Sequence, residues 1–206
     1  MEALSILNNL LGKVIAVKHK KVSFLLAPIL VGLSLQAPAG GMGNTSALDA
    51  EAVQIVKSFA GTLKPKLKGA IAEGGLVSAI NVCSVEAPKI AQTLSAETGW
   101  EVKRVSLKAR NKSSATPDAF ERIVLEQFNE RQANGETAAS MMFSEVVGDE
   151  YRFMKAQGVQ GLCLNCHGDS LQPDVKKALA KRYPDDTATG HSLGEIRGAF
   201  SLRKAL

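Results

Sequence analysis

Apolar residues recur at helical spacing along two long stretches in the first half of the chain. Residues 49–73 and 76–98 each place apolar side chains three or four positions apart, which predicts two long amphipathic helices. Gly99 is expected to end the second helix, and Pro65 is expected to kink or divide the first. Both helices precede every predicted strand.

The rest of the chain changes between strand and helix patterns. Alternating polar and apolar positions predict strands, and proline at a first helical position predicts a helix start. The predicted elements are a strand at 101–109, a helix from 117 to about 132, a hairpin of 141–148 and 150–157 turning at Gly148-Asp149, a helix at 173–182 and a strand at 194–202. This order predicts an α+β fold with a central antiparallel sheet behind the two long N-terminal helices.

The N-terminus has the pattern of an export signal. Lysines precede an uncharged apolar run at residues 22–36, and Ala37-Pro38-Ala39 provides an A-x-A cleavage site. The run is shorter than the ~20 residues of a membrane-spanning helix, and Pro28 interrupts it, although an uncleaved anchor is the alternative. We therefore expect a periplasmic protein with no stable membrane span after cleavage, divided into a signal peptide at 1–39, a linker at 40–48 and a single domain at 49–206.

The net charge does not indicate nucleic-acid binding. The chain carries +5 overall, but residues 1–39 hold four lysines against one glutamate, so most of this charge belongs to the export signal. The remaining residues are close to neutral and numerous enough for one domain with its own core.

Cys163, Cys166 and His167 form the C-x-x-C-H sequence typical of covalent attachment of c-type haem. Two thiols at this spacing can each form a thioether bond to a haem vinyl group, and the adjacent imidazole can bind the iron. The alternatives are a thioredoxin-like redox pair, a zinc site and a disulfide. The export signal favours one covalent haem c, because bacteria attach haem to this motif outside the cytoplasm.

Cys83 is then a single cysteine in an oxidising compartment, which needs an explanation. It lies on the apolar stripe of the second predicted helix, with Ala79 and Ala87 one turn away on either side, so it is expected to face inward. Either it is a small buried apolar residue, or its sulfur is the second axial ligand of the iron. The rival ligands are Met141, Met142, Met154 and His191.

The strand predicted at 101–109 continues into a cationic pattern. Arg104, Ser106, Lys108 and Arg110 alternate with apolar residues, so one face is basic. Arg104 or Arg110 is expected to pair with the haem propionates, with Asn111 adding a hydrogen bond; an exposed polar face is the alternative.

Several sequence blocks together resemble a known family. NVCSVEAPKIA, VKRVSLKARN, PDAFE, CLNCHGD, YPDDTATG and GEIRGA follow one another between residues 76 and 201. They are similar to a family of exported single-haem c-type proteins, a domain of unknown function with a PAS-like fold and Cys/His haem ligation. The resemblance implies attachment at Cys163 and Cys166 in a C-terminal C-x-x-C-H segment, with His167 and Cys83 as axial ligands.

Two positions depart from the pattern of this family. Lys112 stands where a proline is usual, which suggests a looser loop, and His191 stands where a tyrosine is usual, which keeps it a ligand candidate.

A six-coordinate iron leaves no vacancy for a substrate, so we do not expect an enzyme. A thiolate ligand stabilises ferric iron and can leave on reduction or protonation, which favours a redox or small-ligand sensor. A periplasmic electron-transfer cytochrome without a signalling role is the alternative. The expected partners are haem and an unidentified redox or signalling protein.

Overall fold

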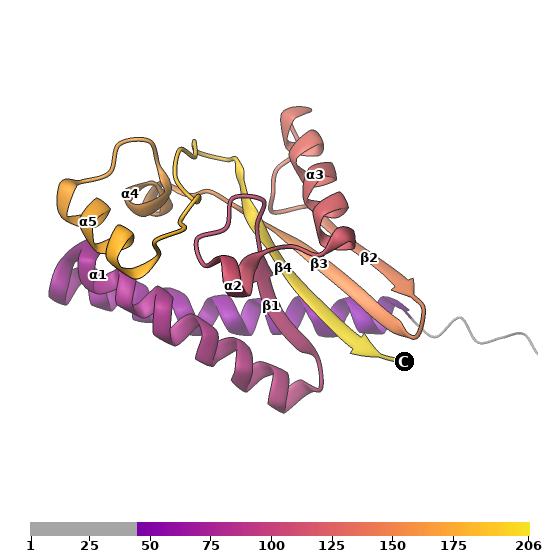
Figure 1. Ribbon diagram of the computed structural model, residues 1–206. Helices are drawn as coiled ribbons and strands as arrows, with labels where there is room; N and C mark the ends of the chain where they lie inside the picture. The colour runs from indigo at the N-terminus through magenta and orange to yellow at the C-terminus, as the bar shows by residue number, and fades with distance from the viewer. Residues whose placement is uncertain (1–44) are drawn as a thin grey trace, which may run out of the picture. The chain divides into compact units, whose positions relative to one another are not determined.

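The computed structural model describes residues 45–206 (Figure 1). The predicted signal peptide at 1–39 and most of the predicted linker lie outside the described residues. Helix α1 begins at Thr45, within that linker. The hydroxyl of Tyr151 donates a hydrogen bond to Asp49 Oδ1 at 2.8 Å and so attaches the first turn of α1 to the sheet.

Helix α1 (Thr45–Thr98) turns back on itself at Gly75, so its two halves correspond to the two predicted helices (Figure 1). Gly75 has φ 71° and ψ −170°, a conformation that glycine adopts without steric cost. Lys66 and Glu86 form an ion pair of 3.0 Å between the two halves. The expectation that Pro65 divides the helix is wrong, because Pro65 lies inside the first half and the break occurs ten residues later at Gly75.

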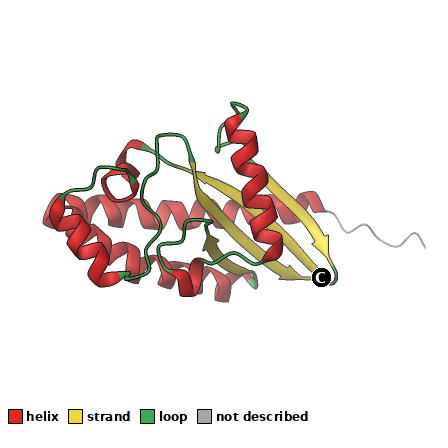
Figure 2. Ribbon diagram, turned by 45° about the horizontal axis from the view of Figure 1, so that its top comes forward, coloured by secondary structure: helices red, strands yellow, loops and turns green. Residues whose placement is uncertain are grey.

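The sheet has four antiparallel strands in the order β1-β4-β3-β2 (Figure 2). Their bounds are β1 Glu101–Val105, β2 Met142–Val147, β3 Glu150–Gly158 and β4 Ile196–Ala205. The α+β class, the antiparallel sheet and the hairpin at Gly148-Asp149 are confirmed. Strand β1 ends four residues earlier than predicted, because the backbone N–H of Ser106 leaves the ladder and donates to the Ala115 carbonyl at 3.0 Å.

Helices cover both faces of the sheet. Along β3 and β4, Phe153 and Leu202 face α1 and pack with Phe59. The intervening residues point the other way and pack against α3 (Ala119–Ala133), where Met154, Ala199 and Phe128 belong to a second core. This alternation follows from the two-residue period of a strand and gives two separate cores.

Helix α3 was predicted to start at Pro117. Its N-cap is Asp118, one residue later, and this residue forms a capping box with Glu121. Asp118 accepts a hydrogen bond from the Glu121 backbone N–H, and the Glu121 carboxylate accepts one from Asp118 N, each at 2.8 Å. The Glu121 side chain is fully buried and also accepts from Lys103 Nζ at 2.9 Å and Ser201 Oγ at 2.7 Å. Glu121 therefore connects α3 to β1 and β4 through charge-assisted bonds.

The C-x-x-C-H segment lies between β3 and β4. The chain therefore continues after it into β4, one of the two inner strands of the sheet. It forms the short helices η1 (Gly161–Cys163) and α4 (Leu164–His167), and helix α5 (Pro173–Arg182) comes next, at the predicted bounds. Figure 1 shows α4 and α5 beside the turn of α1. The remaining helix is α2 (Lys112–Ala115), in the loop between β1 and α3.

Candidate haem site

The two short helices η1 and α4 present both thiols and the imidazole on one compact turn. The Cys163 N–H donates to the Gln160 carbonyl at 2.8 Å, and the Gly168 N–H closes the turn on the Leu164 carbonyl at 2.9 Å. A Cβ at Gly168 would lie 2.7 Å from that carbonyl oxygen, so this tight turn requires glycine. His167 is thereby fixed in position directly after Cys166.

His167 is held through its Nδ1 atom. The Ala188 carbonyl lies 2.7 Å from Nδ1, and Arg197 Nε lies 3.0 Å from the same atom. One nitrogen cannot donate to the first and accept from the second at once. The carbonyl contact is the shorter and requires a proton on Nδ1, so we assign this tautomer and discount the bond from Arg197.

This assignment leaves Nε2 of His167 with its lone pair available. Its nearest polar neighbour is Arg110 Nη1, at the long distance of 3.5 Å. Burial lowers the pKa of His167 to about 2, and the cations of Arg197 and Arg110 add to the effect. The imidazole is therefore neutral. A neutral imidazole that donates Nδ1–H to a carbonyl is the usual state of a metal-binding histidine.

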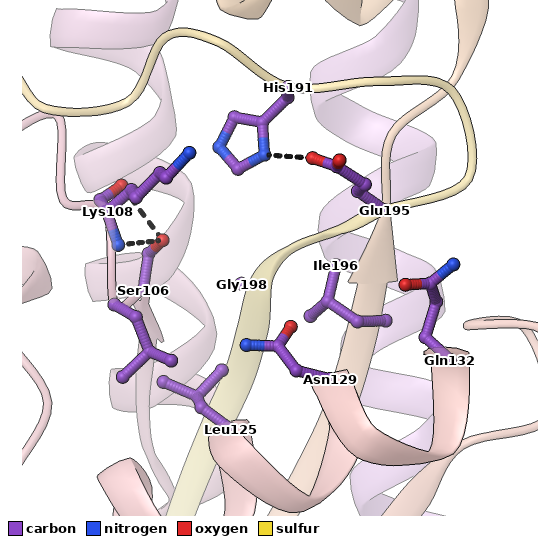
Figure 3. Close-up of a pocket in the computed structure, with 10 residues that line it drawn as sticks. Ser106, Lys108, Leu125, Asn129, Gln132, His191, Glu195, Ile196 and Gly198 are labelled. Carbon is purple, nitrogen blue, oxygen red and sulfur yellow. Dashed lines mark hydrogen bonds and ion pairs between the residues drawn. The ribbon is translucent and has the colours of Figure 1, made fainter. Parts of the chain in front are cut away.

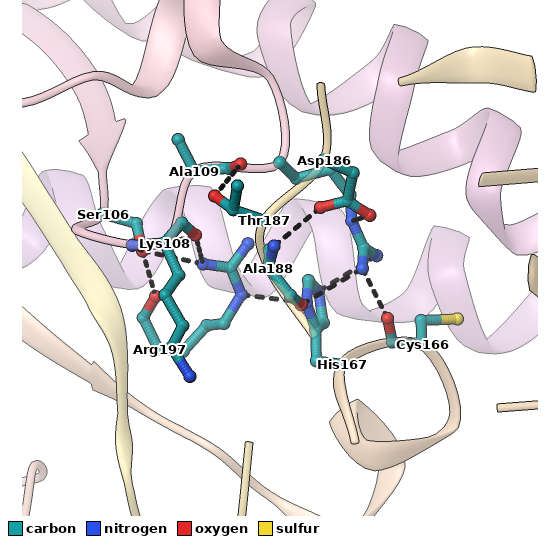
Figure 4. Close-up of polar contacts among 10 residues, drawn as sticks. Ser106, Lys108, Ala109, Cys166, His167, Asp186, Thr187, Ala188 and Arg197 are labelled. Carbon is teal, nitrogen blue, oxygen red and sulfur yellow. Dashed lines mark hydrogen bonds and ion pairs between the residues drawn. The ribbon is translucent and has the colours of Figure 1, made fainter. Parts of the chain in front are cut away.

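Arg110 joins the C-x-x-C-H turn to the loop that follows α5. Figure 4 shows residues of both segments, Cys166 and His167 from the turn and Asp186 and Ala188 from the loop. Its Nε donates to Asp186 Oδ2 at 3.0 Å, while its Nη2 donates to the carbonyls of Cys166 at 2.5 Å and Ala188 at 3.2 Å. Asp186 also accepts from the Ala188 N–H at 2.8 Å. The carbonyl that accepts from His167 is thus held in place by a buried ion pair.

Cys83 lies on α1 between two apolar contacts of this helix. One turn before it, Ile80 packs with α5 and Cys166, and one turn after it, Ala87 packs against the sheet. Cys83 itself belongs to neither apolar cluster. Cys83 is half-buried, between the part of α1 that contacts α5 and the part that contacts the sheet.

The pKa of the Cys83 thiol is affected by several of the other predicted site residues. Burial raises its pKa, whereas Arg104, Arg110 and Arg197 act to lower it, and Cys163 acts to raise it. Cys83 in turn contributes to the raised pKa of Cys166, after burial. Cys83 thus interacts electrostatically with both thiols of the C-x-x-C-H sequence, which follow it by eighty residues or more in the chain.

Three arginines gather around this point with few anions to balance them. Arg110 pairs with Asp186, but within residues 45–206 the guanidinium of Arg104 has no hydrogen-bond or ion-pair partner and lies 5.1 Å from the ring centroid of Phe59. Burial and the repulsion of Arg110 and Arg104 lower the pKa of Arg197 to about 10. A group with two carboxylates, such as haem, fits this cluster because it would supply the missing negative charge.

Asn111 lies at the edge of the predicted site. Its side chain is exposed, and its Oδ1 accepts a hydrogen bond from Ser113 at 2.8 Å. It shares the wall of a cavity of about 340 Å³ with Ser84 and Arg110, next to Cys83. Asn111 is therefore close to the site without facing its centre.

The rival iron ligands are placed differently. Met141 and Met154 are fully buried in the core under α3, and Met142 is half-exposed on the edge strand β2. His191 is the exception, since its ring centroid lies 6.4 Å from that of His167. The two rings are in edge-to-face contact, with an interplanar angle of 71°.

Sequence reasoning missed Arg197 and Asp186. Arg197 Nη1 donates to Ser106 Oγ at 3.0 Å, which orients the guanidinium toward His167. The signal for Arg197 was the GEIRGA block, in which it is the only cation, and the signal for Asp186 was the YPDDTATG block. Both residues reach the site through contacts with distant segments, which spacing does not reveal.

Two observations on the described part of the chain concern the alternative chemistries, a disulfide and a zinc site. None of the three cysteines forms a disulfide there. Residues 45–206 also contain no group of three or more His, Cys, Asp or Glu side chains placed to hold a metal ion.

Comparisons with known proteins bear on the fold and on the family of the chain. No curated protein matches the sequence. The fold matches the crystal structure of the cyanobacterial heme-protein Tll0287 with a TM-score of 0.59 and 23% identity, covering 79% of this chain and 97% of that one. The model of the Tll0287-like family matches residues 33–204, which is most of the sequence. The chain therefore belongs to the Tll0287-like family.

Proposed function

We propose that this chain is an exported protein that binds one haem c covalently and acts as a redox or small-ligand sensor. Cys163 and Cys166 would form the thioether bonds, and His167 Nε2 and Cys83 Sγ would bind the iron from opposite sides. Haem bound in this way would supply a one-electron iron centre. The match to a protein described as a heme-protein supports the haem, and the N-terminal sequence pattern supports periplasmic export.

The observation that supports the proposal is the contact of Arg110 with the C-x-x-C-H turn, in a cluster of three arginines that acts electrostatically on Cys83. His167 is neutral with Nε2 free, and its Nδ1 proton is held by the Ala188 carbonyl. Arg104, Arg110 and Arg197 would pair with the haem propionates. Together with ferric iron they would also favour the thiolate of Cys83, against the effect of burial.

The sensor role rests on Cys83 being a ligand that can leave. Only the thiolate binds iron well, and reduction of the iron weakens that bond. Residues 76–98 carry Cys83 and contact both α5 and the sheet, so release of the sulfur would loosen this helix half. The analogy of a PAS-like fold with sensor domains supports the same role, as an analogy only.

Hydrogen–deuterium exchange of the haem-loaded protein tests this role. We expect amides in residues 76–98 to exchange at least fivefold faster in the reduced protein than in the oxidised protein, because the helix loses its bond to iron. Amides in α3 serve as an internal control, since this helix packs on the other face of the sheet. In a Cys83→Ala variant the two redox states should exchange alike. Equal exchange in both states of the native protein would instead favour a plain electron-transfer cytochrome.

The arginine cluster gives a second prediction. Arg197→Gln should lower the midpoint potential of the haem, because loss of a nearby cation favours the ferric state. A charge about 10 Å away, at an effective dielectric constant of about 20, contributes about 1–2 kcal/mol, or roughly 40–90 mV for one electron. Redox titration followed by optical spectra measures it.

Lys176→Gln is the matched control for charge, because Lys176 lies on the exposed face of α5. It should leave the potential nearly unchanged, since solvent screens its charge. A potential that does not fall in Arg197→Gln, or that falls equally in both variants, would contradict the proposed place of the haem.

A further inference from the structure

A second cavity lies behind the haem-site histidine, on the α3 side of the sheet (Figure 3). It has a volume of about 360 Å³ and is bounded by the loop after β1, by α3 and by the segment that enters β4. Its floor includes Leu125 and Ile196, both buried apolar residues. Cys83 and the C-x-x-C-H turn do not line it, so this cavity is separate from the candidate haem site.

His191 gives this cavity an unused hydrogen-bonding atom. The residue is only 5% exposed, and its Nδ1 lies 3.3 Å from Glu195 Oε2. Its Nε2 is buried and has no partner within residues 45–206. With the proton on Nδ1, where the carboxylate accepts it, Nε2 is an acceptor. A buried acceptor without a donor is costly, and a bound molecule can supply that donor.

The other polar groups of the cavity favour an uncharged molecule. The side-chain amides of Asn129 and Gln132 face the cavity and make no hydrogen bond within the described residues (Figure 3). Lys108 and Glu195 carry opposite charges on its wall, so the cavity has no excess charge that would select an ion. Amides that can both donate and accept, above an apolar floor, suit a small polar molecule with an apolar body.

His191 also connects the cavity to the haem site. Its backbone N–H donates to the His167 carbonyl at 2.9 Å, and the two rings meet edge to face. A molecule that moves the His191 ring would therefore act on the backbone and the ring of the histidine proposed to bind iron.

We propose that this cavity binds a small uncharged molecule that donates an N–H or O–H hydrogen bond to His191 Nε2, and that its binding is sensed at His167. The binding itself is independent of the haem, whereas the coupling rests on the proposed function. The two parts can therefore fail separately.

Calorimetric titration of the haem-loaded protein with benzamide tests the binding. Benzamide is uncharged, carries an N–H donor and has a ring that fits the apolar floor. We expect saturable binding that weakens about tenfold in His191→Phe, which keeps a ring but removes Nε2. Leu193→Ser is the matched control, because Leu193 lies in the same loop and is 68% exposed. It should bind benzamide like the native protein.

Benzoate and benzamidine, which have similar shapes but carry a charge, should bind at least fivefold more weakly. The binding proposal is overturned if benzamide does not saturate the native protein, if His191→Phe binds it equally well, or if either charged analogue binds better.

Optical redox titration with and without saturating benzamide tests the coupling. We expect the midpoint potential to shift in the native protein and in Leu193→Ser, and not in His191→Phe. Binding without any shift would overturn the coupling and leave the binding site established. A protein without covalent haem would contradict the proposed function, yet the calorimetric result for the cavity would still stand.

Discussion

Replacing Cys163 and Cys166 by serine together is expected to leave the protein without covalently bound haem. Serine has nearly the shape of cysteine, with a smaller and more polar hydroxyl in place of the thiol, and cannot form a thioether bond. The C-x-x-C-H turn is held by backbone hydrogen bonds from Cys163 and Gly168, which the substitution preserves. Intact-protein mass spectrometry after expression in a host that matures c-type cytochromes should show one haem on the native chain and none on the double variant.

Cys83→Ser is the matched control, since it also exchanges a half-buried thiol for a hydroxyl. It should retain the haem, because Cys83 is proposed to bind iron and not the porphyrin edge. Haem that remained covalently bound in the double variant would contradict the attachment proposed here. Loss of haem in Cys83→Ser alone would contradict the division of roles among the three cysteines.

Loss of the buried carboxylate of Glu121 should cause the largest change in stability. Glu121 is fully buried and accepts bonds from Lys103, Ser201 and the Asp118 backbone, so Glu121→Ala leaves three donors without their acceptor. Breaking a buried charge pair in this way costs about 3–5 kcal/mol. The free energy of unfolding from urea titration, monitored by circular dichroism, measures the effect.

Two further variants distinguish the loss of the Glu121 charge from a general loss of stability caused by substitution in α3. Glu121→Gln keeps an acceptor oxygen and should lose less, about 1–2 kcal/mol. Glu126→Ala changes an exposed glutamate of the same helix and should stay within about 0.5 kcal/mol of the native protein. A Glu121→Ala variant as stable as Glu126→Ala would show that the buried network contributes nothing net.

Local patterns were sufficient to predict much of the fold. The hairpin at Gly148-Asp149 and helix 173–182 follow from residue period and from turn chemistry, which act between near neighbours. The early end of β1 depends on a bond between Ser106 and Ala115, which belong to different local segments. The break at Gly75 falls between the two predicted helices, whereas the break expected at Pro65 is absent, because a single proline can be kept inside a long helix that is held by its packing.

In the candidate site, too, the features that depend on neighbouring residues could be predicted, and those that depend on distant contacts could not. The C-x-x-C-H sequence is compact, so spacing alone predicted its chemistry. Cys83 was placed there by a family resemblance, and the position it occupies comes from α1, α5 and the sheet together. Arg197 and the ion pair of Asp186 with Arg110 could not be predicted from spacing, because they join segments that meet only in the folded chain.

The most direct test of the central claim compares ferric spectra of the haem-loaded native protein and Cys83→Ala. The claim that Cys83 and His167 bind the iron from opposite sides predicts a low-spin thiolate signature in the optical and electron paramagnetic resonance spectra of the native protein. The Cys83→Ala variant should lose this signature and keep the covalent haem. Identical spectra for the two proteins would contradict the claim, since another side chain would then bind the iron opposite His167.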